Sequence, residues 1–244
     1  SIGRSVTLSP ITWKAGWPML GLEGNLGRAP RTWLKPNDSS PSSLPSLPKA
    51  PYNRNEDFNG KALGRIWQWN HNPDDTKWSL KNGRLRLQSM PAEQLMWARN
   101  TLTQRVIGPT SIATVELYTK GLKDGDVAGL GNINVPCSWI GITKDDARLH
   151  LRCFEQAIND TVTLGIAATD GAIKKVWLRM VGDYDHDCAH YEYSLDGEVY
   201  HQVGREMPLS YQLISFQGSR HALFAFNHKR SRSEERFSRN AETD

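Results

Sequence analysis

A chain of 244 residues with 38% hydrophobic and 23% charged residues has the size and balance of one globular domain with appendages. Its net charge of +4 arises at the ends, because residues 1–36 hold five Lys/Arg against one Glu, and residues 228–244 hold five against four acids. The part between is close to neutral and has no apolar run of about 18 residues, so neither a nucleic acid nor a membrane is an expected partner.

Four segments follow one another along the chain. Residues 1–36 are rich in Gly, Pro and Trp, and they begin without Met and without a signal-peptide pattern, as if cut from a longer protein. Residues 37–51, rich in Pro and Ser, predict a semi-stiff linker. Residues 52–227 are dense with strand signals. Residues 228–244 are polar and charged, and their composition predicts a disordered tail.

The segment 52–227 shows the two-residue alternation of polar and apolar side chains that is typical of strands. The clearest runs are 84–87, 111–119, 148–152, 175–181, 190–195, 199–203 and 222–226. Turn pairs separate the runs, at Asn59-Gly60, Asn82-Gly83, Asp124-Gly125, Asp170-Gly171 and Asp196-Gly197. Many short strands with regular turns predict an all-β, antiparallel two-sheet sandwich, and only residues 93–101 could form about two helical turns.

No residue pattern for catalysis is present. The chain lacks a Glu-x-Asp-x-x-Glu pattern, which would place catalytic carboxylates on one strand, and it lacks a nucleophile elbow, a phosphate loop and a zinc-binding helix. Its three cysteines, Cys137, Cys153 and Cys188, are too few and too scattered for a disulfide framework, so they are predicted to be small buried side chains. We expect no cofactor to take part.

Two acidic clusters are candidates for metal binding. Glu56 and Asp57 lie at the start of the sandwich, where hard carboxylate oxygens could hold a structural Ca²⁺; the alternative is an exposed acidic strand end. The second cluster runs from Asp183 to Asp187 and includes His186. It could contact a metal or a sugar, or it could form an ordinary turn.

Tryptophan is the strongest binding signal, with nine in the chain. Flat sugar faces pack on aromatic rings, and sugar hydroxyls need amide, carboxylate or guanidinium partners. Trp67 and Trp69 are two residues apart, so a strand would place them on one face, and Trp139 follows the loop 131–137. Each could instead pack in the core. Gln217 and Arg220 offer hydroxyl partners, unless they form a turn in which Arg220 pairs with an acid.

Longer stretches resemble family 43 glycoside hydrolases. ITWKAGWP at 11–18 and NLGRAPRTWLKP at 25–36 are similar to the end of that family's catalytic β-propeller. EDFN at 56–59 and WQWNHNP at 67–73 resemble the start of its C-terminal concanavalin A-like, jelly-roll sandwich. AGLG, VGDYDHD, YSLDG and FQGSR continue the resemblance in order, at 128–131, 181–187, 193–197 and 216–220.

The resemblance implies a short propeller remnant at 1–36 and an accessory sandwich at 52–227 of a bacterial β-xylosidase or α-L-arabinofuranosidase. The family's catalytic carboxylates lie on earlier propeller blades, so no catalytic residue is assigned and the chain alone is expected to be inactive. The main hypothesis is weak binding of xylan or arabinoxylan. The alternatives are a purely structural module that braces the catalytic propeller, and a glycoside hydrolase in its own right, which would need an acid pair.

On this resemblance, either of the first two roles would use the aromatic face and its loops. The predicted carbohydrate-binding residues are Trp67, Trp69, His71, Trp139, Gln217 and Arg220. Relatives continue after residue 227 with a final strand that helps to form a Ca²⁺ site, whereas this chain reads HKRSRSEERFSRNAETD. We therefore expect an exposed sheet edge, weakened Ca²⁺ binding and self-association through that edge.

Overall fold

The computed structural model describes residues 8–34, 54–146, 148–157, 173–210 and 217–229, together with the backbone of 160–169. The chain divides into two compact units, one spanning Arg4–Tyr52 and a larger one that contains Asn53–Asp244. In the described residues, no helix is long and apolar enough to span a membrane. The predicted turn at Asp170-Gly171 and Phe216 lie outside the described residues.

The smaller unit is built on one antiparallel hairpin. Strands β1 (Ile11–Lys14) and β2 (Trp17–Leu20) pair in register, and the turn between them has positive φ at Ala15 and Gly16. Most of the hairpin's side chains are exposed, including Trp13 at 69% and Trp17 at 73%. Its interpretation as a propeller remnant stays a prediction.

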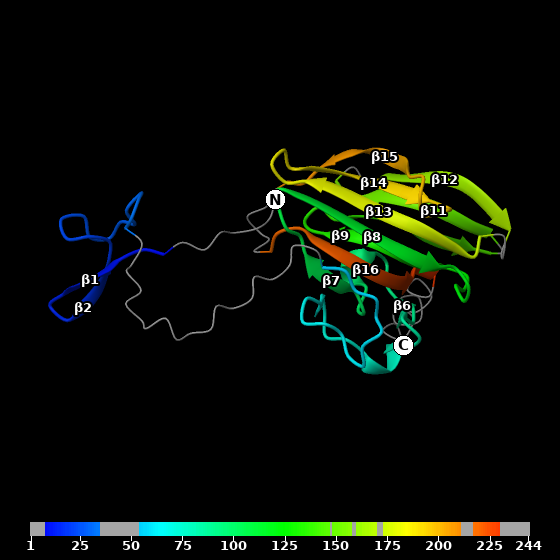
Figure 1. Cartoon of the computed structure of the whole chain (residues 1–244), viewed down its shortest axis with the longest axis horizontal. Helices are drawn as coiled ribbons and strands as arrows, with labels where there is room; N and C mark the ends of the chain where they lie inside the picture. Colours follow the sequence, from blue (N-terminus) through cyan, green and yellow to red (C-terminus); the bar gives the residue numbers. More distant parts are fainter. Residues whose placement is uncertain are drawn as a thin grey trace, which may run out of the picture. The chain divides into compact units, whose positions relative to one another are not determined.

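A large sheet forms the body of the other unit (Figure 1). Its order is β12-β11-β10-β9-β16-β7-β3, with β6 paired in parallel to the end of β16. The strands are β3 (Gln68–Trp69), β6 (Met90–Pro91), β7 (Leu102–Arg105), β9 (Asp126–Ile133), β10 (Ser138–Asp145), β11 (Arg148–Glu155), β12 (Asp160–Thr169) and β16 (Arg220–Asn227).

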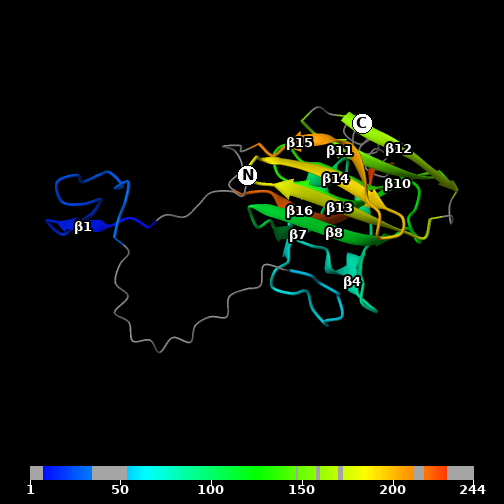
Figure 2. The ribbon, with the colours of Figure 1, turned by 45° about the horizontal axis from the view of Figure 1, so that its top comes forward.

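A four-stranded antiparallel sheet covers one face of the large sheet, in the order β15-β14-β13-β8 (Figure 2). Its strands are β8 (Thr110–Tyr118), β13 (Lys175–Asp183), β14 (Cys188–Ser194) and β15 (His201–Pro208). The small hairpin β4 (Trp78–Leu80) and β5 (Leu85–Leu87) and the 3₁₀ turns η1 (Asp75–Lys77) and η2 (Leu95–Trp97) complete the unit. The predicted antiparallel sandwich is confirmed, and residues 93–101 form a single 3₁₀ turn.

Two hydrophobic clusters pack against the large sheet, one on each face. The inner cluster lies between the sheets and includes Ile140, Leu151, Leu178 and Tyr191, all fully buried. The outer cluster lies on the opposite face, beneath the segment 54–101 (cyan in Figure 1). It includes Leu95 of η2 and the aromatic side chains of β10 and β16. The middle of the large sheet, at β9 and the first six residues of β10, is therefore buried on both faces.

The last described strand, β16, lies inside the large sheet rather than at its edge. It pairs with β9 along its whole length and with β7 from Arg220 to Leu223. The strands beyond it, β3 and β6, have two residues each, and such short strands offer few unpaired backbone groups. Self-association through a sheet edge stays a prediction, which sedimentation at increasing protein concentration can test.

The ordered structure extends beyond residue 227, where the tail was expected to begin. Lys229 donates to Asp124 over 2.6 Å, and the backbone N–H of His228 donates to the carbonyl of Gly125. The predicted boundary of the sandwich at residue 227 stays a prediction.

Candidate functional site

An open polar groove of about 480 Å³ lies on the outer face of the large sheet. Strands β3 and β7, the start of β16 and the residues next to them supply its lining. The lining residues are Gln68, Trp69, Asn70, Thr103, Arg105, Gln217 and Arg220. Three of the predicted binding residues, Trp69, Gln217 and Arg220, are therefore brought together although about 150 residues separate Trp69 from the other two.

Strand register explains why these polar side chains converge. In the antiparallel ladder Arg220 lies opposite Arg105, and Thr103 lies opposite Gln68. Residues that face each other across an antiparallel pair project to the same side of the sheet. Gln68, Thr103 and the two arginines therefore share the outer face.

Arg220 forms the floor of the groove and is only 5% exposed. Its Nε donates to Thr103 Oγ1 over 2.9 Å, and its Nη2 donates to Gln68 Oε1 over 2.7 Å. Burial, and then the charge of Arg105, lower the pKa of Arg220. The sequence allowed an acid as the partner of Arg220, but both of its hydrogen-bond partners among the described residues are neutral.

The predicted tryptophans have three different environments. Trp67 stacks on Phe58 at 5.7 Å between ring centroids and is half-buried, outside the groove lining. Trp69 is also half-buried, lies tilted against Trp78 at 5.2 Å and lines the groove. An exposed indole that the sequence analysis did not single out, Trp97 of η2, is 64% exposed.

Trp139 does not offer a ring face to solvent, contrary to expectation. It is 7% exposed and stacks on Phe154 at 5.7 Å, with Phe224 edge-on at 5.8 Å. Its strand, β10, is paired on both sides, and opposite Trp139 stands Gly131, which leaves room for Leu95. Trp139 is thus a member of the outer core.

His71 lies close to the groove but outside its lining. Its exposed ring donates from Nε2 to the carbonyl of Met96 over 2.8 Å, and this bond ties residues 70–73 to η2. The neighbouring Asn70 does line the groove, and its backbone N–H donates to the carbonyl of Thr101. His71 therefore supports the groove wall from outside.

The two acids proposed for Ca²⁺ each serve their own turn. Glu56 accepts from the backbone N–H of Phe58 over 3.1 Å, and Asp57 accepts from the backbone and side-chain nitrogens of Asn59. These bonds from Asn59 lower the pKa of Asp57. Ca²⁺ needs six to eight oxygen ligands, and the described residues contain no group of three acids, histidines or cysteines placed to hold a metal. Binding of Ca²⁺ by Glu56 and Asp57 stays a prediction.

The cluster from Asp183 to Asp187 forms the turn between β13 and β14. Asp183 accepts the backbone N–H groups of Asp185 and His186, and it pairs with the His186 ring at 2.8 Å. The contact with His186 lowers the pKa of Asp183, and the same contact raises the pKa of His186. These contacts are those of an ordinary turn.

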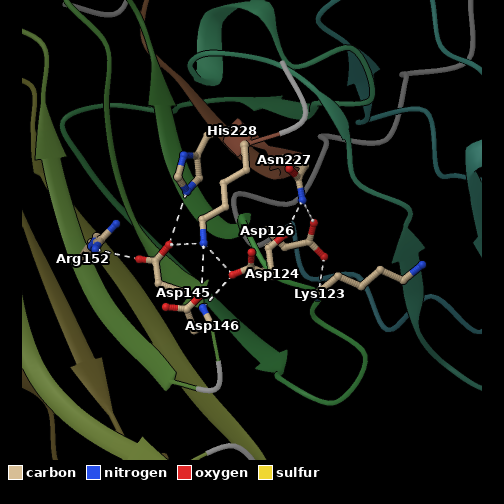
Figure 3. Close-up of polar contacts among 9 residues, drawn as sticks. Lys123, Asp124, Asp126, Asp145, Asp146, Arg152, Asn227 and His228 are labelled. Atoms are coloured by element: carbon tan, nitrogen blue, oxygen red, sulfur yellow. Dashed lines mark hydrogen bonds and ion pairs between the residues drawn. The ribbon is translucent and has the colours of Figure 1, made fainter. Parts of the chain in front are cut away.

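A third acidic cluster lies at the other end of β16, where Asp124 and Asp145 approach each other (Figure 3). Lys229 Nζ lies 2.6 Å from Asp124 and 3.8 Å from Asp145, and Arg152 bonds Asp145 at 2.8 Å. Hydrogen bonding to Lys229 lowers the pKa of Asp124 and raises that of Lys229. Cations of the same chain therefore compensate these carboxylates.

Among the described residues, the groove lining holds amides, a hydroxyl, guanidinium groups and an indole, and no carboxylate. Hydrolysis of a glycosidic bond ordinarily requires a carboxyl pair. The lining instead matches the hydroxyl groups and apolar ring faces of a sugar.

Comparison with known proteins identifies the sandwich. Residues 55–238 match the family model of the β-xylosidase C-terminal concanavalin A-like domain. A protein of Xylanibacter ruminicola, provisionally named a β-xylosidase, is 33% identical over 86% of this chain, and a β-xylosidase of Formosa agariphila is 29% identical over 93%. The chain spans only 37% and 40% of the length of these two relatives.

Solved structures agree with this match. A bifunctional family 43 protein of Bacteroides eggerthii aligns over 91% of this chain with a TM-score of 0.65 and 29% identity, and this chain covers 28% of it. An engineered family 43 enzyme with endo-xylanase and exo-arabinofuranosidase activity aligns over 91% of this chain and 45% of its own length, with a TM-score of 0.67 and 26% identity. The chain therefore belongs to the family of C-terminal concanavalin A-like accessory domains of family 43 glycoside hydrolases, as its sequence motifs predicted.

Proposed function

We propose that this domain binds xylan-type chains in the groove between β3, β7 and β16, as a non-catalytic partner of a β-xylosidase or α-L-arabinofuranosidase. The observation that carries the proposal is the groove itself, open, polar and free of carboxylates, with one indole in its lining. The named activities of the relatives support a xylan-type ligand.

Within this groove, Trp69 would pack against one sugar ring, and Gln68, Asn70 and Gln217 would exchange hydrogen bonds with hydroxyl groups. A groove of about 480 Å³ lies in the usual range for small-ligand sites, enough for one or two sugar units. Binding of this kind would hold the parent enzyme near its polymer without taking part in bond cleavage.

Affinity electrophoresis in native gels that contain arabinoxylan tests the proposal. The chain should be retarded, and Trp69→Ala and Gln217→Ala should each weaken the retardation at least about threefold. Trp97→Ala is the matched control, because it removes an exposed indole outside the groove. Gln217 is exposed, so its variant tests the groove even if loss of the Trp69–Trp78 contact lowers stability.

If the unmodified chain migrates unretarded at every polysaccharide concentration, the binding proposal is wrong. Equal weakening by Trp97→Ala would also contradict it, because the groove would then not be the site.

A second candidate function is bracing of the catalytic propeller, and the smaller unit favours it. Trp13, Trp17 and Leu34 are 69%, 73% and 85% exposed, so the smaller unit does not bury these apolar side chains by itself. In the longer parent, the preceding part of the protein would cover this surface. Hydrogen exchange in the hairpin should then slow when that part is supplied in trans, and unchanged exchange would count against bracing.

A further inference from the structure

Arg220 carries a buried charge that the described residues do not balance. Its guanidinium has five N–H donors, of which Thr103 and Gln68 accept two. In the described part of the chain, no carboxylate lies within ion-pair distance of it. Buried charges are normally paired, because removing an ion from water without a counter-charge is costly. The remaining N–H donors of Arg220 are therefore available to bind a ligand in the groove.

Arg105 adds a second positive charge on the same face. It lies directly opposite Arg220 in the ladder, is exposed, and forms no ion pair with any described residue. The other lining residues are neutral, so the groove carries two positive charges and no negative one. The segment 37–227 is close to neutral overall, so this excess is local to the groove.

We propose that the groove recognises a sugar bearing a carboxylate, a uronic acid unit attached to or within a glycan chain. Arg220 would receive the carboxylate through two parallel N–H···O bonds, the geometry in which guanidinium and carboxylate match best. Arg105, at the exposed side, would strengthen the attraction. This inference rests on the proposed function, because it assigns the type of sugar to the same groove.

The neighbouring groups favour a uronate over a free inorganic anion. Trp69, Asn70 and Gln217 line the groove beside the arginines, and they suit a sugar's apolar face and hydroxyl groups. A phosphate or sulfate ion would use the guanidinium groups alone. The combination of paired arginines with an indole and amides fits a ligand that is anionic at one point and hydroxylated elsewhere.

Isothermal titration calorimetry of the full chain provides the test, with two xylo-oligosaccharides as ligands. One carries a single glucuronic acid branch, and the other is the same molecule with its carboxyl group reduced to an alcohol. We expect the acidic oligosaccharide to bind at least about tenfold more tightly, since hydrogen bonds to charged groups are the stronger ones. Equal affinities would overturn the inference and leave xylan binding standing, whereas binding of neither ligand would overturn both.

Two variants test which arginines produce the preference for the acidic ligand. Arg105→Gln, at an exposed position, should reduce the preference for the acidic ligand about threefold, and Arg220→Lys should abolish most of it, because an ammonium group lacks the planar fork. Arg148→Gln is the control, because Arg148 is exposed on β11, three strands away from β16 in the sheet. An equal loss in this control would mean that the preference reflects overall charge, which would overturn the inference.

Competition with free anions tests whether the groove recognises a uronate or any anion. Free glucuronate should displace the acidic oligosaccharide at lower concentration than inorganic phosphate does. If phosphate competes equally well, the groove is a general anion site and the assignment of a uronic acid is wrong.

Discussion

Lowering the pH from 7.5 to 5 should destabilise the sandwich through one histidine of β16. His221 projects to the inner face of the large sheet, where its Nε2 lies 2.9 Å from Ser111 Oγ of β8. Its Nδ1 is inaccessible to solvent and has no hydrogen-bond partner in the described structure. Burial lowers the pKa of His221 from 6.5 to about 4.

The sign of the effect follows from which state binds the proton. Between pH 6.5 and 4 the unfolded chain protonates this histidine while the folded chain does not, so the stability it supports is complete above pH 6.5 and is lost as the pH falls. The lowering of this pKa from 6.5 to about 4 corresponds to about 3 kcal/mol in total, of which about 2 kcal/mol is lost by pH 5. Since part of the residue keeps contact with solvent, this figure is an upper bound.

Urea unfolding followed by tryptophan fluorescence at pH 7.5 and pH 5 measures this loss. His221→Gln cannot be protonated, so its free energy of unfolding should fall by less over this interval, by up to about 2 kcal/mol. His201→Gln, at an exposed position of β15, is the control and should keep the loss seen in the unmodified chain. Asp196, with its pKa lowered to about 2 chiefly by the backbone N–H groups of Glu198 and Val199, contributes little above pH 5. An equal loss in all three proteins would refute this role of His221.

Three further experiments test the packing of the sandwich. Gly131→Ala should cost about 1–3 kcal/mol in chemical unfolding, because the new Cβ would lie 2.6 Å from Leu95 Cδ2; an unchanged midpoint would contradict this close packing. Arg205→Ala should cost about 1–3 kcal/mol in the same assay, since it leaves the buried Glu155 carboxylate without its two-bond partner, whereas no loss would mean that solvent replaces the arginine. Thiol labelling of the folded chain should modify Cys188 first, because Cys188 is half-buried while Cys137 and Cys153 are buried, and burial raises the pKa of these two to about 11 and about 12; rapid labelling of three thiols would indicate local opening.

Alternation along the sequence predicted the strands that have one buried and one accessible face. β8, β11 and β13 alternate in burial along their length, and all three were expected. β9 was not expected, because each of its residues is buried, with the inner core on one side and the outer cluster on the other. A strand covered on both faces has no polar face to produce alternation. β10, buried along its first six residues, escaped prediction for the same reason.

The groove was only partly predictable because its residues meet through sheet topology. The chemistry of Trp69, Gln217 and Arg220 was recognisable from residue type alone, but their proximity depends on β16 inserting between β9 and β7. Thr103 and Arg105 lie on a four-residue strand that was not expected. Trp139 shows the opposite error, since a tryptophan after a loop suggested exposure while its strand lies inside the sheet.

The central position of β16 lets stability and binding be changed separately. At its far end Asn227 is fully buried, and its Nδ2 donates to the carbonyl of Asp124 over 2.9 Å and to Asp126 Oδ1 over 2.8 Å. Asn227→Ala removes a bond to the buried Asp126 carboxylate and a half-buried bond to Asp124, and it should lower the free energy of unfolding by about 1–3 kcal/mol. Asn227 lies seven positions along the extended strand from Arg220 at the groove, a distance of roughly 23 Å.

Affinity for the acidic oligosaccharide should therefore stay unchanged in Asn227→Ala at temperatures where the variant is fully folded. Gln217→Ala should do the reverse. It should weaken binding while the free energy of unfolding stays within about 0.5 kcal/mol of the original, because the Gln217 side chain is exposed. If Asn227→Ala weakened binding as much as Gln217→Ala, the two ends of β16 would be coupled. The groove would then depend on the registration of the whole strand rather than on the side chains that line it.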